Sequence, residues 1–354
     1  MGVVHCLCKL RGEELMDKLL HQLLTTAAPS GYEEALQAVF KEYISKYVDS
    51  IEADNMGNII AVRKGPKGSP KVMFSAHCDE VGFLVSNIDD NGFLYVQEIG
   101  GIDTDLLPGR KVDIHTEKGV LAGVIGKKAI HLTKGEEKKK LEISDIWIDI
   151  AANSKEDAEN KVQIGDFVTY AKDVVFYEND MVASPSTDDR IGVWTLVETA
   201  KILAGQSLNC SIYFVSSCQE ELGARGAKTA ADHIHPDVGI AIDVTHATDY
   251  PTADTKHTGC IKLGKGPVIT MGPNINADVC RQLKKAVGDM PVQYEAIARP
   301  TGTDANVMQL SSGGVKTGLI SIPCRYMHTP YEMVSVDDAR HAANLLGQFV
   351  LHNF

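Results

Sequence analysis

The sequence lacks any apolar run approaching the ~20 residues that a membrane-spanning helix needs, so we expect no transmembrane segment. Residues 1–15 contain mixed charges and no apolar core of a secretory signal, which predicts that no such signal is present. The chain begins Met1-Gly2, but Cys6 stands where N-myristoylation prefers Ser or Thr, and this argues against that modification.

A cysteine framework is also missing. Eight cysteines are scattered over 354 residues without a Cys-x-x-Cys pair, which predicts reduced thiols and a cytoplasmic protein. Basic residues are outnumbered, 35 against 47 acidic ones, and the net charge of −12 disfavours nucleic acid and anionic membrane as partners. The same acidic balance is compatible with binding cations or amine-bearing substrates. With 44% hydrophobic residues, the chain has enough apolar side chains for a globular core.

The chain before residue 80 has helical and then strand-like periodicity. We expect helices over 14–24 and 32–47, a hairpin of strands over 50–54 and 58–63, and a buried strand over 71–75. Ser30 followed by Glu33 resembles a capping box for the second helix.

The pattern of apolar residues and turn signals changes over residues 81–177. Short alternating segments are separated by turn signals such as Asp90-Asn91-Gly92 and Pro108-Gly109, which is typical of a small β-barrel or sandwich. A brief helix is expected over 154–160, and the charged stretch 135–140 is expected to be a solvated loop.

After residue 180 helices and strands alternate again. We expect helices over 189–204, 223–233, 276–287 and 337–351, and strands over 210–216, 238–244, 293–298 and 317–322. The predicted fold is an α/β catalytic domain with a mixed sheet, formed by residues 1–79 and 177–354 and interrupted by a small β-barrel of residues 80–176.

Asp188 and Asp189 stand together where an irregular segment becomes a helical pattern. By themselves they are explained by an acidic helix start, because carboxylates near a helix N-terminus satisfy free N–H groups. Four other possible metal ligands favour a second interpretation of Asp188, because each lies at the end of a predicted strand. These are His77, Glu221, Asp243 and His328.

Each of these four residues has a simpler explanation, as a polar strand end, a solvated carboxylate, a cap or a turn residue. Together they are harder to explain, because side chains at the carboxyl ends of parallel strands meet at one edge of a sheet. Two imidazoles and three carboxylates suit Zn²⁺, Co²⁺ or Mn²⁺. The sequence therefore predicts a metal site in which Asp188 bridges two ions.

Five ordered segments resemble the M42 metallo-aminopeptidases, the self-compartmentalising tetrahedral (TET) enzymes often called glutamyl aminopeptidases. The resemblance covers nearly the whole chain from Met16. The segments are 76–82, 186–192, 219–223, 241–245 and 323–330.

This resemblance implies a peptide hydrolase with two divalent metal ions per chain, most simply Zn²⁺ or Co²⁺. It would remove N-terminal residues from peptides with a free N-terminus, through a water molecule activated by two metals. The implied roles are His77 and Asp243 on one metal, Glu221 and His328 on the other, Asp188 between them, Glu220 as general base, and Asp79 orienting His77. Cys78 and Thr329 depart from the expected pattern without touching the ligands. The inserted β-barrel is expected to make the contacts of a homo-oligomer, a dodecamer built from dimers.

Other functions stay open at this point. A related di-zinc carboxypeptidase or deacylase would need a cation for the substrate carboxylate, and Arg190, Arg299 or Arg325 could supply it. A nucleophilic hydrolase could use Cys218, although the chain has no Gly-x-Ser-x-Gly elbow. A catalytically silent assembly or binding module would not need the complete ligand set.

Overall fold

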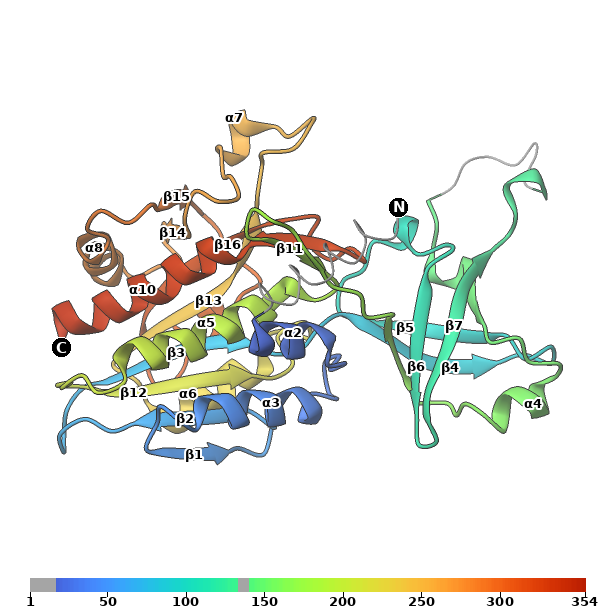
Figure 1. Ribbon diagram of the computed structural model, residues 1–354, viewed down its shortest axis with the longest axis horizontal. Helices are drawn as coiled ribbons and strands as arrows, with labels where there is room; N and C mark the ends of the chain where they lie inside the picture. Colours follow the sequence, from blue (N-terminus) through green and yellow to red (C-terminus); the bar gives the residue numbers. More distant parts are fainter. Residues whose placement is uncertain (1–16, 133–139) are drawn as a thin grey trace, which may run out of the picture.

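The computed structural model of the protein describes residues 17–132 and 140–354 and shows two bodies, each with its own hydrophobic core (Figure 1). Buried residues of the larger core come from 19–78 and 182–350, and those of the smaller core from 81–170. The larger body is an α/β structure with a mixed sheet, and the smaller one is a closed antiparallel barrel. The predicted fold class is confirmed.

The larger body is built on an eleven-stranded sheet. Its main path runs in the order β1 (Ser50–Ala53), β2 (Ile59–Arg63), β12 (Ser211–Ser217), β3 (Lys71–His77), β13 (Val238–His246), β16 (Lys316–Arg325), β17 (Glu332–Ser335), β11 (Met181–Ser184) and β10 (Val175–Phe176), while β14 (Val268–Met271) pairs with β16 and β15 (Gln293–Ala296) pairs with β14. The four central strands, from β12 to β16, are parallel to one another and largely buried. Their near-continuous apolar sequences follow from this, because helices cover both of their faces.

Two groups of helices cover the central strands (Figure 1). In one group, α5 (Thr187–Leu203) packs on β3 and β13 and is flanked by α2 (Lys18–Thr25), α3 (Glu34–Ile44) and α10 (Val336–Asn353), with α8 (Ala277–Ala286) next to α10. In the other, α6 (Arg225–Ile234) and α9 (Asp304–Met308) pack together and contact β3. A short helix, α7 (Thr255–Thr258), lies in the connection after β13. No helix in the described ranges is long and apolar enough to cross a membrane.

The smaller body is a closed six-stranded barrel inserted between β3 and β10. Its strand order is β4 (Gly82–Ile88), β5 (Leu94–Ile99), β8 (Ile146–Asp149), β7 (Gly119–Lys127), β6 (Lys111–Thr116) and β9 (Phe167–Tyr170). Short 3₁₀ turns occupy Thr104–Leu106, Ile130–Leu132 and Ile143–Asp145. The expected brief helix is α4 (Lys155–Glu159), which begins at Ser154, whose side chain accepts a hydrogen bond from the Asp157 N–H. The predicted solvated loop lies outside the described residues, except for Lys140.

The predicted capping box at Ser30 and Glu33 is wrong. Helix α3 has no side-chain cap, and the Ser30 hydroxyl instead donates to Asp79 Oδ2 at 2.6 Å. Glu33 accepts hydrogen bonds from the backbone N–H groups of Gly31 and Gln219. Both side chains are therefore used by tertiary contacts near the sheet edge rather than by the helix.

Candidate metal centre

The seven residues singled out from the sequence meet at one edge of the larger sheet. His77 is the last residue of β3, Glu220 and Glu221 follow β12, and His328 lies between β16 and β17. Because β3, β12, β13 and β16 are parallel, their carboxyl ends lie together. Asp243 does not end its strand as expected, since β13 continues to His246.

Asp188 lies at a break in the backbone at the start of α5. Asp188 and Asp189 have non-helical backbone angles, and the peptide bond between them is cis. The apolar periodicity correctly predicts the helix that follows. It does not predict this break, which carries Asp188 off the helix and toward the strand ends.

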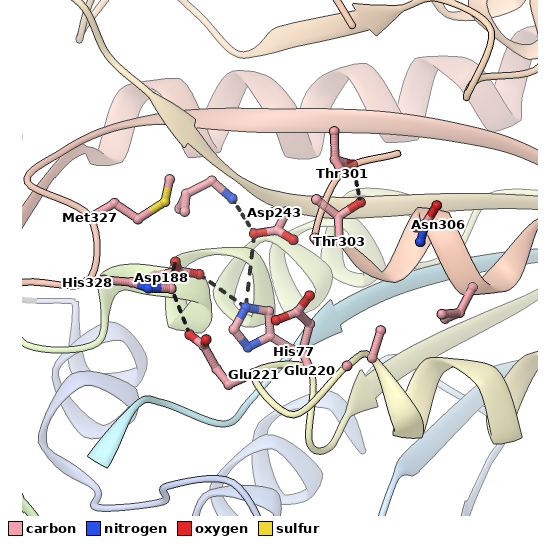
Figure 2. A pocket seen from close by; sticks show the side chains of 15 residues that line it. His77, Asp188, Glu220, Glu221, Asp243, Thr301, Thr303, Asn306, Met327 and His328 are labelled. Carbon is pink, nitrogen blue, oxygen red and sulfur yellow. Dashed lines mark hydrogen bonds and ion pairs between the residues drawn. The ribbon is translucent and has the colours of Figure 1, made fainter. Parts of the chain in front are cut away.

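The two carboxylate oxygens of Asp188 face two different imidazoles (Figure 2). Oδ1 lies 3.1 Å from His77 Nε2, and Oδ2 lies 3.4 Å from His328 Nε2. Asp243 Oδ1 lies 4.0 Å from His77 Nε2, and Glu221 Oε1 lies 3.3 Å from His328 Nε2. The arrangement thus forms two groups of three possible ligands, His77–Asp188–Asp243 and Asp188–Glu221–His328, that share Asp188.

Glu220 also lies within reach of a metal ion. Together with His77 and Glu221 it forms a third group whose ligand atoms are within 4.8 Å of one another. Proximity alone therefore does not separate a ligand from a base in this pair of glutamates.

The electrostatics of the cluster favour added positive charge. Burial raises the pKa of Glu220 to about 10 and, with the neighbouring Asp189, raises that of Asp243 well above its usual range. Hydrogen bonds to Asp188 and Glu221 raise the pKa of His328 to about 11. Burial would raise the pKa of Asp188 too, but the two imidazoles hold it below its usual range. Buried carboxylates this close repel one another, and divalent cations relieve that repulsion. The N/O donor set fits Zn²⁺ or Co²⁺.

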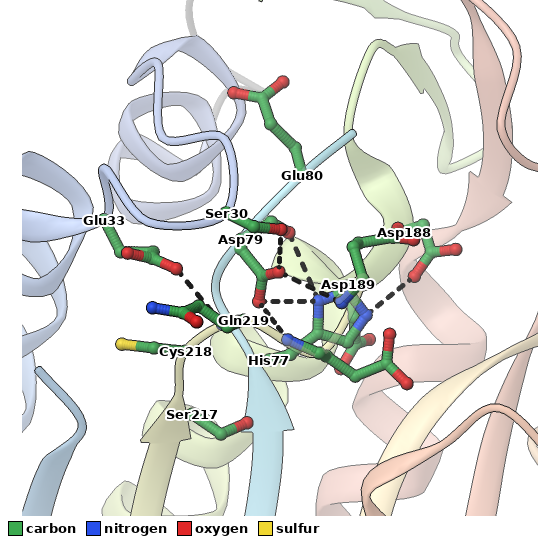
Figure 3. A network of polar contacts seen from close by, with 12 residues as sticks. Ser30, Glu33, His77, Asp79, Glu80, Asp188, Asp189, Ser217, Cys218 and Gln219 are labelled. Carbon is green, nitrogen blue, oxygen red and sulfur yellow. Dashed lines mark hydrogen bonds and ion pairs between the residues drawn. The ribbon is translucent and has the colours of Figure 1, made fainter. Parts of the chain in front are cut away.

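The side chain of Asp79 contacts several parts of this cluster (Figure 3). It is fully buried, and its Oδ1 lies 3.5 Å from His77 Nδ1. The same carboxylate accepts hydrogen bonds from the backbone N–H groups of Glu220 and Glu221, at 3.0 and 3.1 Å. One side chain therefore fixes both an imidazole and the turn that carries the glutamates.

Glu332, at the start of β17, was not anticipated from the sequence. Its buried carboxylate accepts hydrogen bonds from the backbone N–H groups of Asp188 and His328, both at 2.8 Å, and from the Thr187 hydroxyl. Burial and the nearby Asp188 raise the pKa of Glu332 to about 8. Glu332 therefore holds two candidate ligands in place through their backbones.

A cavity of about 420 Å³ opens beside the cluster. One side is formed by the candidate ligands and Glu220, and the other by Thr301, Thr303, Asn306 and their neighbours (Figure 2). The sequence marks residues 301–304 only as a glycine-rich turn and gives no sign that they face the cluster.

The residues required by the alternative functions do not face this cavity. Arg190 is fully buried and donates hydrogen bonds to the carbonyls of Leu23 and Thr26, while Arg325 pairs with Asp249. Arg299 is exposed and is not among the lining residues. Cys218 is buried beside Cys78 and accepts a hydrogen bond from Gln37.

Several known proteins are similar to this chain over most of its length. The family model of the M42 glutamyl aminopeptidases matches residues 57–345. The lysyl aminopeptidase of Pyrococcus furiosus is 37% identical over 335 residues, which are 93% of this chain and 94% of the relative. The structure of an aminopeptidase from Desulfurococcus kamchatkensis shares 36% identity and a TM-score of 0.88, covering 94% of this chain and 93% of its own.

A second solved structure is the Pyrococcus horikoshii TET1 peptidase, described as assembling into a tetrahedron or a large octahedral shell. It shares 32% identity and a TM-score of 0.83, and the match covers 94% of this chain and 98% of the other. The chain therefore belongs to the M42 glutamyl aminopeptidase family and is an aminopeptidase.

Proposed function

We propose that the protein removes N-terminal residues from peptides by using two divalent metal ions and Glu220 as general base. The observation that supports this most directly is the pair of three-residue ligand groups that share Asp188. His77 and Asp243 would hold one ion, Glu221 and His328 the other, and Asp188 would hold both. When bound, two such ions activate a water molecule and polarise the scissile carbonyl.

The chain's own groups would handle the proton and the substrate. Glu220 lines the cavity, and its carboxylate makes no hydrogen bond with the residues that the structure describes, so it is available to a water molecule. As a base it would take a proton from the water and return it to the leaving amine. Nearby cations would favour its ionised form, against the burial that raises its pKa. The acidic side chains of the cavity suit the free α-ammonium group of a peptide.

The two bodies would have different tasks. Residues 1–79 and 177–354 would form the catalytic domain, and residues 80–176 would form an inserted domain that joins chains into a large homo-oligomer. The barrel contributes none of the candidate ligands. A cytoplasmic location agrees with the six described cysteines, all of which are free.

Metal removal tests the proposal directly. We expect EDTA to abolish hydrolysis of aminoacyl p-nitroanilides and Co²⁺ or Zn²⁺ to restore it, because all five proposed ligands are exchangeable N/O donors. Elemental analysis should show about two ions per chain in the active sample. Full activity in a sample shown to be metal-free would contradict the two-metal mechanism.

A further inference from the structure

We propose that the cavity beside the metal centre selects peptides whose N-terminal side chain is uncharged, and that Asn306 sets this preference. The inference rests on the proposed aminopeptidase function, since it concerns the substrate of the same site. Family membership does not decide the question, because the family is named for glutamyl residues and a relative for lysyl residues.

The cavity wall opposite the metal cluster is neutral. It contains Thr301, Gly302, Thr303, Asn306 and Val307, and Val244 and Met327 also line the cavity. Every titratable side chain among the lining residues belongs to the candidate metal cluster or is Glu220. Among the residues that the structure describes, no lysine or arginine lines this cavity.

This distribution of charge disfavours both acidic and basic substrate side chains. A glutamyl carboxylate entering the neutral wall would lose water and find no cation there. A lysyl ammonium would find no carboxylate except those needed by the metal ions and the reaction. An apolar side chain gains free energy by leaving water, and Val307 offers it an apolar contact on this wall.

Asn306 is placed to contact such a side chain. It is partly exposed on α9, and Figure 2 shows it on the same side of the cavity as Thr301 and Thr303. Its side-chain amide makes no hydrogen bond with any residue that the structure describes, so the amide is free for a ligand.

The neutral wall is held rigidly. Asp304, at the start of α9, is buried and accepts hydrogen bonds from the hydroxyls of Ser75 and Ser217, each at 2.6 Å. These serines belong to β3 and β12, the strands that lead to His77 and to the two glutamates. The wall therefore keeps a fixed position relative to the metal cluster, as discrimination between side chains requires.

The substrate profile of the unmodified protein is the first test. With metal-loaded protein, we expect kcat/KM for leucyl and methionyl p-nitroanilides to exceed that for lysyl and glutamyl p-nitroanilides by about tenfold or more. A lysyl or glutamyl substrate hydrolysed best would overturn the inference. Hydrolysis of none of the four would overturn the proposed function instead, so the two failures are distinguishable.

Charge exchange at Asn306 is the second test. Asn306→Asp should raise the lysyl-to-leucyl ratio of kcat/KM about tenfold, and Asn306→Lys should raise the glutamyl-to-leucyl ratio similarly. Asn209→Asp and Asn209→Lys make the same charge changes at an exposed residue just before β12, at the opposite end of that strand from the site, and should leave both ratios unchanged. Ratios that do not move in either Asn306 variant, in folded protein with normal metal content, would overturn the role of Asn306.

Binding can be measured apart from turnover. In the Glu220→Gln background, calorimetry should show tighter binding of Leu-Ala than of Lys-Ala or Glu-Ala, and Asn306→Asp should reverse the order of the first two. Equal affinities for the three dipeptides would contradict selection by the neutral wall.

Discussion

Glu220 and Glu221 are neighbours in the chain, but their carboxylates face different groups. Glu221 Oε1 lies 3.3 Å from His328 Nε2, whereas the Glu220 carboxylate has no hydrogen-bond partner among the described residues. We predict that Glu220→Gln keeps about two metal ions per chain and lowers kcat by ~10²–10⁴, the usual contribution of general acid–base catalysis. Glu221→Gln should lose one ion and regain part of its activity at high added metal. Steady-state kinetics combined with elemental analysis of both variants checks this.

The exposed Glu42→Gln near the C-terminal end of α3 provides the matched control, because it makes the same chemical change more than two helical turns beyond Glu33 and should alter neither quantity. If Glu220→Gln lost metal while Glu221→Gln kept both ions, the two assignments would be reversed. That result would agree with the third ligand group, which contains both glutamates.

Single residues differ in how far the sequence predicts them. His77, Glu221 and His328 could be found because each lies at or just after the end of a recognisable apolar strand, and parallel strands bring their ends together. Glu332 could not, since it acts by accepting hydrogen bonds from the backbones of Asp188 and His328, and no spacing rule predicts such contacts. Asn306 could not be assigned to the site from the sequence either, because it lies far along the chain from every candidate ligand except His328, on a helix of only five residues.

Several elements meet at a buried ion cluster where the chain passes between the two bodies. Glu80 follows β3 and is 2% exposed, and its carboxylate accepts hydrogen bonds from Lys172, Ser186 and Arg190. Lys172 lies just after β9, on the segment by which the chain leaves the barrel. Ser186 comes two residues before Asp188. This ion cluster therefore links the two segments that connect the bodies to the start of α5.

This cluster predicts a loss of stability in acid. Burial alone would raise the pKa of Glu80, but the charges of Lys172 and Arg190 outweigh it and bring the pKa to about 2. Since the folded pKa lies below 4.5, the ordinary value of a glutamate, ionised Glu80 stabilises the fold above about pH 4.5. This contribution is lost as the pH falls toward 2.

Glu80→Gln should therefore lower the free energy of unfolding by about 3–5 kcal/mol near pH 7, because two buried cations lose their carboxylate. The difference from the unmodified protein should shrink between about pH 4.5 and 2. Urea unfolding followed by the fluorescence of Trp194, which is buried on α5, measures it. A difference that did not depend on pH would show that Glu80 is not ionised in this cluster.

Elements were predictable where an apolar period runs for several residues. The patterns of α5, α10 and the four central strands are of this kind. The sequence does not predict strands β11, β14 and β17, which have four residues each and leave little room for an alternating pattern, although the equally short β1 and β15 are predicted. The capping box failed for another reason: Ser30 and Glu33 are taken by contacts with Asp79 and Gln219, which are distant in sequence.

At the scale of the whole molecule, the barrel carries apolar side chains that are largely exposed in the single chain. Val120 and Val124 on β7 are 63% and 50% exposed, and Ile164, just before β9, is 68% exposed. Residues four apart on a strand point to the same side, so the two valines form one face. Exposed apolar faces of this kind are typical of protein–protein contacts.

We therefore predict that the protein forms a homo-oligomer far heavier than the 38.4 kDa chain and that the barrel makes its contacts. Light scattering at micromolar concentration should show the large particle, and excision of the insertion should reduce it to a much smaller species. Val120→Glu combined with Val124→Glu should have the same effect without deleting the barrel, since two carboxylates would have to be buried unpaired in the interface. Gln97→Glu adds negative charge at an exposed position on β5 and should leave the particle intact. A monomer for the unmodified protein, or an unchanged particle for the double valine variant, would contradict assembly through this face of the barrel.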